Sequence, residues 1–510
     1  MLRKRLCQII IGVTIAVFGG APALFAQLVC TANVGVPSTA RAEGLAEEVG
    51  DLLLNCTGGT STTSGAPVPV VNITISLNTN VTSRINGANV SESLLLIDEP
   101  QPSSQLVCTP GPCAITGTGT GSGVYDGSTG RPNIFIGTLL NATTIGFSNV
   151  PLDPPGAGTR LLRFTNVRAN AFQLSSAQVP TPVTLDIAVT GAEAVLINNP
   201  TQTAAFTQPG LIVSSIIPRS DVAFLACGSN NAVVNASTPA DFSINFSEGF
   251  ASAFKVQAAA DQSLPGFPYN TETGFYNPAL SGIVVSALAD SGTRLRATFN
   301  NIPAGVSIYV TTTQTNSSSS SLQAALTSSE SGPFSAVAAT VGNYAQIPIT
   351  NGSGIAVWEI LMADPNSRET ANFGVVVSYG TSVGAATVTV SGNLAPVSTI
   401  GVASSGPAPR FADTSVPQTA FVIAGCPTQT IYPQPPLPDA EVGNAYSITF
   451  AVVPTSQVQW LVVQGGLPPG QTLYAQSGIL SGIPVTAGLY TSPFGRRIQV
   501  GVARLSRRIH

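Results

Sequence analysis

Histidine, the side chain that most often moves protons in enzymes, occurs once in this sequence of 510 residues, as His510. A Ser-His-Asp triad needs an imidazole to take the serine proton, and most catalytic zinc sites need histidine ligands. The sequence therefore predicts neither kind of active site.

Pairs of carboxylates are the remaining catalytic device, and glycosidases use them as acid and base. The chain has 24 acidic residues, which is sparse for its length. Nothing in the sequence places two of the candidates across one cleft, so we predict that the protein is not an enzyme. The candidates are Asp241, Glu248, Asp261 and Glu272.

Cysteine usage points to disulfide bonds rather than to a metal site or a thiol nucleophile. Six cysteines remain once Cys7 is set aside with the N-terminal segment described below, and an even number is typical of exported proteins. No two of them form a CxxC pattern, and six cysteines allow many connectivities. Pairing of neighbours predicts three bridges, the third clasping the two ends of one domain: Cys30–Cys56, Cys108–Cys113 and Cys227–Cys426.

The N-terminus has the features of a secretory signal peptide. Basic residues at positions 3–5 precede an apolar run, Ile9–Phe18, and small residues lead to a cleavage site after Ala23 or Ala26. We expect residues 1–26 to be removed and the mature chain to be exported, with an uncleaved membrane anchor as the alternative. No later run of about 18 apolar residues exists, so we predict no other membrane span.

Composition favours β-structure and disfavours nucleic acid as a partner. Charged residues make up 9% of the chain, and lysine occurs only at Lys4 and Lys255. Long surface helices need many lysines and glutamates, whereas frequent Thr, Ser, Val and Gly suit exposed sheets. The formal net charge of −4 gives no basic surface for phosphates.

Alternating apolar and polar residues predict strands that are buried on one face. In "VNITISLNTNV", every second residue from Val71 to Leu77 is aliphatic. We expect an all-β protein of tandem β-sandwich domains, with an N-terminal region at 27–226 and a second region at 227–426. Two similar segments, "GTRLLRFTNV" and "GTRLRATFNNI", suggest that these sandwiches are related.

A third, smaller domain follows a proline-rich linker that we place at 427–436. Within "LPPGQTLYAQSGILSGIP", Pro469 sets φ for position i+1 of a tight turn, and Gly470 tolerates positive φ at position i+2. Ser477 and Gly478 turn the chain a second time. The two turns predict a short β-meander in a small sandwich.

These motifs resemble the bacterial Ig-like, or cadherin-like, domain family over about residues 437–490. The resemblance implies an extracellular Ig-like sandwich that serves as a spacer or adhesion unit, and some relatives bind calcium between domains. Gln471 and Ile483 depart from the usual residues of the family. The matching positions are Gly443, Tyr446, Trp460, Leu467, Pro468, Pro469, Gly470, Gly478, Ser481, Gly482, Pro484 and Gly488.

A larger departure from the family lies at the C-terminus, where the pattern breaks at Pro493 and becomes basic. We expect an incomplete domain at 437–495 that lacks its last strand through a reading-frame change or a truncated gene. A basic tail at 496–510 follows, and a tail with its own role is the alternative. A missing strand would leave an open sheet edge.

Two further sets of residues are candidates for ligand binding. Asp98, Glu99 and the turn from Asp364 to Glu369 offer carboxylates to calcium, but turn capping explains them as well. We therefore expect no cofactor and keep calcium as a hypothesis. Trp358 and Trp460 could stack on sugars, but both lie in apolar strands, so we predict core positions.

Together these observations predict an exported, extracellular or cell-surface protein with a structural or adhesive role. Its partner would be an unidentified extracellular protein or polysaccharide. One alternative is a module that binds carbohydrate through exposed aromatic residues. Another is a subunit of a surface assembly that is joined by strand addition at open sheet edges.

Overall fold

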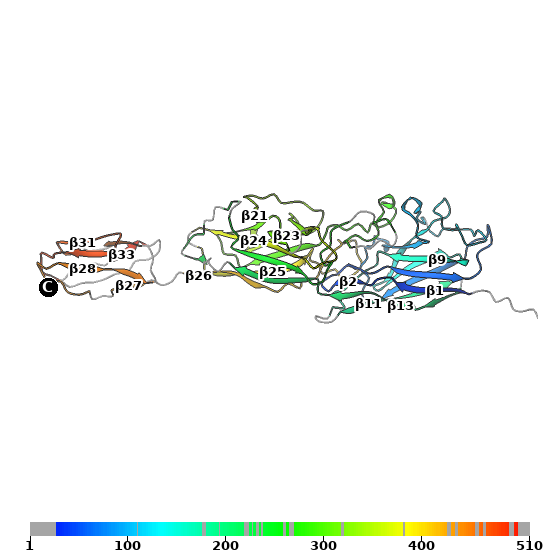
Figure 1. The fold of residues 1–510 in the computed structure, drawn as a ribbon, viewed down its shortest axis with the longest axis horizontal. Coiled ribbons are helices and arrows are strands. Elements are labelled where there is room, and N and C mark those ends of the chain that lie inside the picture. The colour runs from blue at the N-terminus through cyan, green and yellow to red at the C-terminus, as the bar shows by residue number, and fades with distance from the viewer. Residues whose placement is uncertain are drawn as a thin grey trace, which may run out of the picture.

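Three β-rich bodies follow one another along the long axis of the molecule in the computed structural model (Figure 1). Regular structure in the described residues is all β, apart from two short 3-10 turns at Pro102–Ser104 and Pro278–Leu280. None of the described helices is long and apolar enough to cross a membrane. The structure describes residues 27–497 without 110, 176–179, 193, 219–223, 227, 231–233, 236–237, 259–261, 265–269, 318–320, 381–382, 426–429, 434–436, 454–457, 463–465 and 489–493, so the predicted signal peptide and most of the basic tail lie outside it.

The first domain is one long sheet in the order β12-β1-β4-β9-β6-β7-β8-β5-β11-β13-β2. It curls until β1 also approaches β13, and thereby encloses its own core. A two-stranded ribbon, β3 (Glu47–Glu48) with β10 (Arg168–Ala169), lies apart from it. The strands of the sheet are β1 (Leu28–Val34), β2 (Ser38–Arg41), β4 (Leu52–Gly58), β5 (Val70–Leu77), β6 (Val90–Ile97), β7 (Ile134–Asn141), β8 (Thr144–Pro151), β9 (Gly156–Thr165), β11 (Thr181–Gly191), β12 (Val195–Asn198) and β13 (Thr201–Gln208).

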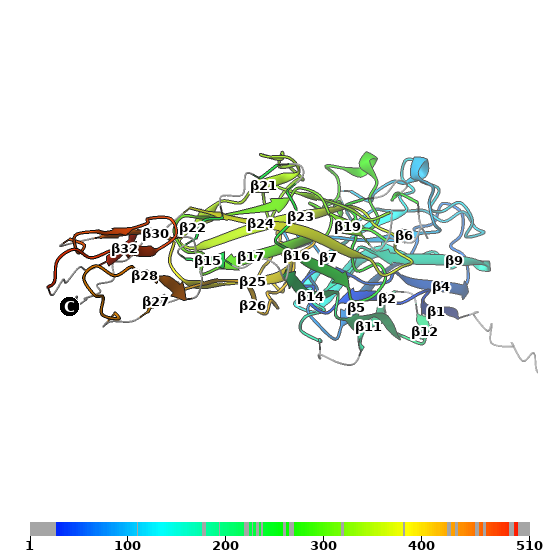
Figure 2. The same cartoon turned by 60° about the vertical axis from the view of Figure 1, so that its left-hand side comes forward.

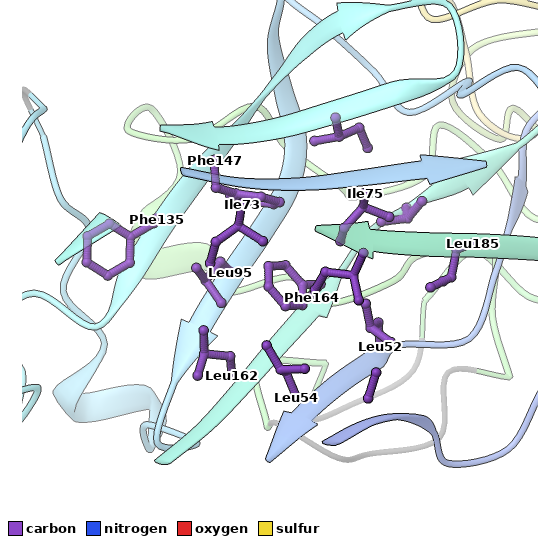
Figure 3. Close-up of a cluster of buried hydrophobic side chains, with 14 of the residues drawn as sticks. Leu52, Leu54, Ile73, Ile75, Leu95, Phe135, Phe147, Leu162, Phe164 and Leu185 are labelled. Carbon is purple, nitrogen blue, oxygen red and sulfur yellow. The ribbon is translucent and has the colours of Figure 1, made fainter. Parts of the chain in front are cut away.

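The predicted alternation holds in β5, where Val71, Ile73, Ile75 and Leu77 are buried. Their side chains meet those of β4, β8, β9 and β11 in the core shown in Figure 3. Period-2 burial of this kind is what a strand with one core-facing side requires. The predicted all-β class is therefore confirmed.

The second domain packs two sheets face to face. Its core contains Trp358, whose ring stacks on Phe373 with centroids 4.0 Å apart and whose Nε1 donates to the carbonyl of Thr311 at 2.8 Å. One sheet comprises β14 (Leu211–Pro218), β16 (Phe242–Glu248), β24 (Thr370–Tyr379), β18 (Val306–Thr311), β21 (Tyr344–Gln346) and, beside β24, β19 (Asn316–Ser317). The other comprises β15 (Phe224–Leu225), β26 (Gln418–Ala424), β25 (Ala386–Ala395), β17 (Arg294–Asn300), β23 (Ser353–Met362), β20 (Gln323–Leu326) and, beside β23, β22 (Ile349–Thr350).

Strand pairing starts this domain earlier than the expected boundary at residue 227. β14 begins at Leu211, three residues after the end of β13, and pairs with β16 of the second domain. The two similar segments also differ in orientation. In β9, Arg160 lies on the core-facing side with Leu162, whereas in β17 the core-facing residues begin with Leu295, one position after the matching arginine.

The third domain has its own small core around Trp460, which is 5% exposed and lies 5.5 Å from the ring of Phe450. Its strands are β27 (Thr430–Tyr432), β28 (Tyr446–Thr449), β29 (Ala451–Val453), β30 (Gln459–Val462), β31 (Gln471–Leu473), β32 (Ile479–Gly482) and β33 (Phe494–Arg497).

Two expectations about this domain need correction. The segment expected to be a linker contains β27, which pairs with β29 because Ile431 is buried in the core of the third domain. The last strand, expected to be missing, is present as β33, which pairs with β30 and extends two residues into the expected tail. Backbone pairing at an edge does not require the alternating side-chain pattern that the sequence lacks here.

The predicted turns agree with the structure. The amide of Gln471 donates to the carbonyl of Pro468 at 3.1 Å, and Gly470 has φ of +91°, as the i+2 position of a type II turn requires. Gly478 also has positive φ, and a Cβ there would lie 2.6 Å from Nε1 of Trp460.

Candidate functional site

The first two domains meet through a set of buried charged side chains, which we call the junction cluster. Its core members in the first domain are Arg41, Glu47, Glu48, Glu92 and Arg168. Glu272 is their main partner from the second domain. In a chain with so few charges, this concentration is the most unusual feature of the structure.

Arg41 at the end of β2 reaches into the second domain. Its guanidinium pairs with Glu47 at 2.7 Å and makes a two-pronged contact with Glu272 at 2.7 and 2.8 Å. It also donates to Oγ1 of Thr293 at 2.9 Å and lies 4.7 Å from the ring centroid of Phe411. The buried guanidinium thus takes one of its partners from the first domain and the others from the second.

Arg168 of β10 makes the second crossing. It donates to Oε1 of Glu92 at 3.1 Å and to the backbone carbonyl of Glu272 at 2.7 Å. Its Nη2 lies 3.7 Å from Oε2 of Glu48. Glu272 therefore accepts hydrogen bonds from Arg41 at its carboxylate and from Arg168 at its backbone carbonyl.

Backbone contacts join the domains around these ion pairs. Glu43 accepts hydrogen bonds from the amides of Gly210 and Leu211, in the segment that links the two domains. The amide of Leu45 donates to the carbonyl of Arg410 at 2.9 Å. Relative sliding of the domains would break these bonds as well as the ion pairs.

A further arginine pair crosses the same boundary. Arg84 pairs with Asp290 at 2.5 Å and donates to the carbonyl of Leu288 at 2.7 Å. Asp290 also accepts from the amide of Ala408 at 2.9 Å. This pair is more exposed than the junction cluster and extends the polar contact toward the surface.

An apolar contact completes the interface. Phe275 and Leu280 of the second domain pack against Leu94, Leu96 and Ile134 of the first. Asn166 fixes this contact by donating to the carbonyl of Phe275 at 2.9 Å and accepting from its amide at 2.8 Å. The adjoining cavity, of about 10 Å³, has room for a single water and not for an organic ligand.

Burial perturbs the ionisation of the cluster. Burial raises the pKa of Glu48 to about 7, against the attraction of Arg168, and no hydrogen bond reaches either of its carboxylate oxygens. Burial also lowers the pKa of Arg41, but the charges of Glu272 and Glu47 outweigh it and raise that pKa above its usual value. The ion pairs are thus held in their charged form, while Glu48 is about half protonated at pH 7.

The acidic candidates do not gather in one cleft. Glu272 belongs to the junction cluster, whereas Glu248 accepts from the amides of Phe254 and Glu369, and Asp241 accepts from the amide of Val377. Asp261 lies outside the described residues. Glu248 and Asp241 hold backbone segments in place, and Glu272 holds the guanidinium of Arg41.

The residues considered for calcium are also engaged. Asp98 pairs with Arg160 and Glu99 with Arg163, while Asp364 caps its own turn at Asn366. Within the described part of the chain, no group of three Asp, Glu, His or Cys side chains could hold a metal ion. Calcium binding stays a hypothesis.

The structure contains the two short-range disulfides that neighbour pairing predicts. Cys30 and Cys56 face each other across β1 and β4, and Cys108 is bonded to Cys113 in a loop. Cys227 and Cys426 lie outside the described residues, so their pairing stays a prediction. Beside the second bridge is an open groove of about 300 Å³, lined by Val90, Phe135, Ile136 and Phe147 among others.

The motif residues of the third domain build its turns and core. Gly443 takes positive φ, and its amide donates to the carbonyl of Pro484. Tyr446 donates to the carbonyl of Pro438 and packs, with Leu467, against the core. Six others lie in or beside the two turns and β32: Pro468, Pro469, Gly470, Gly478, Ser481 and Gly482. Gly488 follows the end of β32 by six residues.

One feature of the sequence coincides with the junction cluster. Its first-domain half comes largely from "ARAEGLAEEVGD", which contains Arg41, Glu43, Glu47 and Glu48 and is the densest run of charge in the chain. A charge run normally indicates a solvated surface. Its burial could not be foreseen, because the partner residue, Glu272, lies more than two hundred positions later.

No family model matches this chain, and no curated protein matches it. Among solved structures, the chain is similar to the C-terminal domain of the AgI/II polypeptide BspA of Streptococcus agalactiae, at 7% identity and a TM-score of 0.25, over 72% of this chain and 95% of that one. It is also similar to the serine-rich repeat adhesion glycoprotein Srr1 of the same species, at 9% identity and a TM-score of 0.19, over 72% and 91%.

A three-domain fragment of titin, I67–I69, gives 8% identity and a TM-score of 0.22, over 95% of this chain and 98% of that one. These neighbours are built from Ig-like or adhesin domains. TM-scores this far below 0.5 support no statement about what the present chain binds.

Proposed function

We propose that this protein is an exported structural or adhesion protein of the cell surface, without enzymatic activity, whose first two domains form one rigid rod. The observation that supports this proposal is the junction cluster. Breaking a buried ion pair strands a charge away from water and costs several kcal/mol. A junction built in this way resists bending, as a spacer that holds a binding surface away from the cell must.

The three bodies in a row suit the same role. The first two share a continuous interface, and the third follows at the end of the rod (Figure 2). Two disulfides and a surface poor in charge suit an extracellular environment. The partner in this proposal is an extracellular protein or polysaccharide.

The carbohydrate-binding alternative loses its two best candidates, because Trp358 is fully buried and Trp460 is 5% exposed. Among the described aromatic side chains, Tyr432 and Tyr474 are the most exposed, at 48% and 54%, and both belong to the third domain. A sugar site, if one exists, would therefore be sought there.

The test is a glycan and matrix-protein binding array with the purified mature chain, run with calcium and with a chelator. The proposal predicts that any binding is to a matrix protein and is the same with calcium as with the chelator. A spacer without its own ligand would bind nothing on the array. Binding to one class of sugar that is lost on Tyr474→Ala would overturn it in favour of a carbohydrate-binding module.

A further inference from the structure

Arg160 of β9 holds the carbonyl group of one particular peptide bond, the bond between Asp153 and Pro154. Both its Nε and its Nη2 donate to the carbonyl oxygen of Asp153, each at 3.3 Å. Two donors of one cation on a single carbonyl oxygen form the arrangement that stabilises negative charge on that oxygen during acyl transfer.

The position of Arg160 is fixed from three sides. It pairs with Asp98, donates to the carbonyl of Gly121 at 2.7 Å, and lies 4.6 Å from the ring centroid of Tyr125. The Gly-rich loop at 117–123 thus serves to hold this guanidinium. With a side chain only 2% exposed, the donors are in place before any reaction.

The side chain of Asp153 is fully buried and only half satisfied. Its Oδ1 accepts from the amide of Thr62 at 2.7 Å, whereas no hydrogen bond reaches its Oδ2. A buried carboxylate oxygen without a partner is costly and rare in folded proteins. The Thr62 amide also marks Oδ1 as an acceptor, so the proton of the neutral acid belongs on Oδ2.

We propose that Asp153–Pro154 is a self-cleavage site. Oδ2 attacks the carbonyl carbon of its own residue and closes a five-membered cyclic anhydride, while the bond from that carbon to the proline nitrogen breaks. The acid proton of Oδ2 passes to the proline nitrogen, and Arg160 stabilises the charge on the carbonyl oxygen. Water then opens the anhydride and leaves Asp153 as a new C-terminus and Pro154 as a new N-terminus.

The reaction is favoured because attacker and target belong to one residue, which removes the entropic cost of bringing them together. The proline nitrogen, in a tertiary amide, is more basic than that of a secondary amide. It therefore accepts the proton more readily and leaves as the neutral amine. Two charged or titratable groups contact Asp153: Arg160 at its carbonyl and the Tyr125 hydroxyl at its amide, while Asp98 pairs with Arg160. Closure of the anhydride consumes the acid form of the side chain, so cleavage speeds up as the pH falls.

Cleavage would leave the first domain assembled. β9 follows the bond and pairs with β4 and β6, which precede it. Neither described disulfide crosses the bond, since both lie before it. The two pieces therefore separate only under denaturing conditions.

The chain contains one other Asp-Pro bond, Asp364–Pro365, which serves as an internal control. There the aspartate is only half-buried, and both of its carboxylate oxygens accept hydrogen bonds, from Asn366 and from Ser367. The test is to hold the folded mature chain between pH 4 and 7 and to follow fragments by denaturing electrophoresis and mass spectrometry. We expect a fragment that begins at Pro154, formed at least tenfold faster than any cut at Asp364–Pro365.

Arg160→Gln separates this chemistry from ordinary acid lability, and Pro154→Ala checks that the cut falls at this bond. Arg160→Gln should slow the cut at least tenfold, and Pro154→Ala, which leaves Asp153 and Arg160 in place, should abolish it. Asp364→Ala should leave the rate unchanged. Equal cleavage at both Asp-Pro bonds, cleavage only in unfolded chain, or no cleavage of the folded chain across this pH range would overturn the proposal.

Discussion

Arg41 is the residue on which the junction depends most, because its side chain is 1% exposed and all of its charge is met by Glu47 and Glu272. Replacing Glu272 by glutamine should destabilise the protein by about 3–5 kcal/mol, since it leaves a buried guanidinium partly unpaired. Chemical denaturation of the mature chain measures this loss.

The matched control is Arg296→Ala, which removes a more exposed ion pair with Glu330 inside the second domain. That change should cost less than about 1 kcal/mol. Equal effects of the two substitutions would show that burial at the junction contributes nothing.

Glu48 makes the junction sensitive to pH. Its folded-state pKa is raised to about 7, above the ordinary 4.5, so folding favours the protonated form. Stability should therefore be greatest at the acid end and fall as the pH rises from about 4.5 through 7, by roughly 3 kcal/mol for this group alone.

Glu48→Gln should flatten that slope in a series of denaturation curves across this pH range. Part of the slope will remain, because burial also raises the pKa of Glu248 to about 7. A variant that keeps the full slope would contradict the assignment to Glu48.

Among the elements, the turn around Gly470 should contribute strongly to the stability of the third domain. An alanine there would need positive φ and would place its Cβ 2.0 Å from the carbonyl oxygen of Ile483. Gly470→Ala should lower the melting temperature of the third domain alone, by several degrees, in a calorimetric scan. Gly466→Ala is the control, because a Cβ there meets nothing within 4 Å.

The third predicted disulfide, Cys227–Cys426, depends on how β15 and β26 pair. β15 and β26 pair in parallel, with Leu225 opposite Ala424. Cys227 and Cys426 each follow two positions later in the sequence, which favours their pairing. Peptide mapping of the unreduced protein should recover a Cys227–Cys426 peptide, and free thiols at either position would rule the bridge out.

Local signals in the sequence were enough for the strands and turns but not for their order or edges. Period-2 burial in β5 and the proline-glycine turn before Gln471 depend on neighbouring residues only, and both were predictable. β33 pairs through its backbone, and β14 joins the second domain by pairing with β16, which follows after β15. Neither leaves a pattern in its own residues.

The candidate site was less predictable for the same reason. Glu272 was noted as a carboxylate that a glycosidase could use, yet it pairs with Arg41, which lies far away in the chain. Charge type and density are visible in a sequence, whereas burial and partner are decided by how whole domains meet.

On the scale of the whole molecule, scarce charges are concentrated where two domains touch. Arg41, Arg84 and Arg168 all reach partners across one boundary. We infer that their pairing fixes the angle between the first two domains.

Small-angle X-ray scattering of the mature chain and of Glu272→Gln, both at pH 7, measures whether this angle is fixed. We predict that the wild-type profile fits a single arrangement of the first two domains, while the variant needs an ensemble of bent arrangements. A wild-type profile that already requires such an ensemble, unchanged in the variant, would contradict the rigid rod.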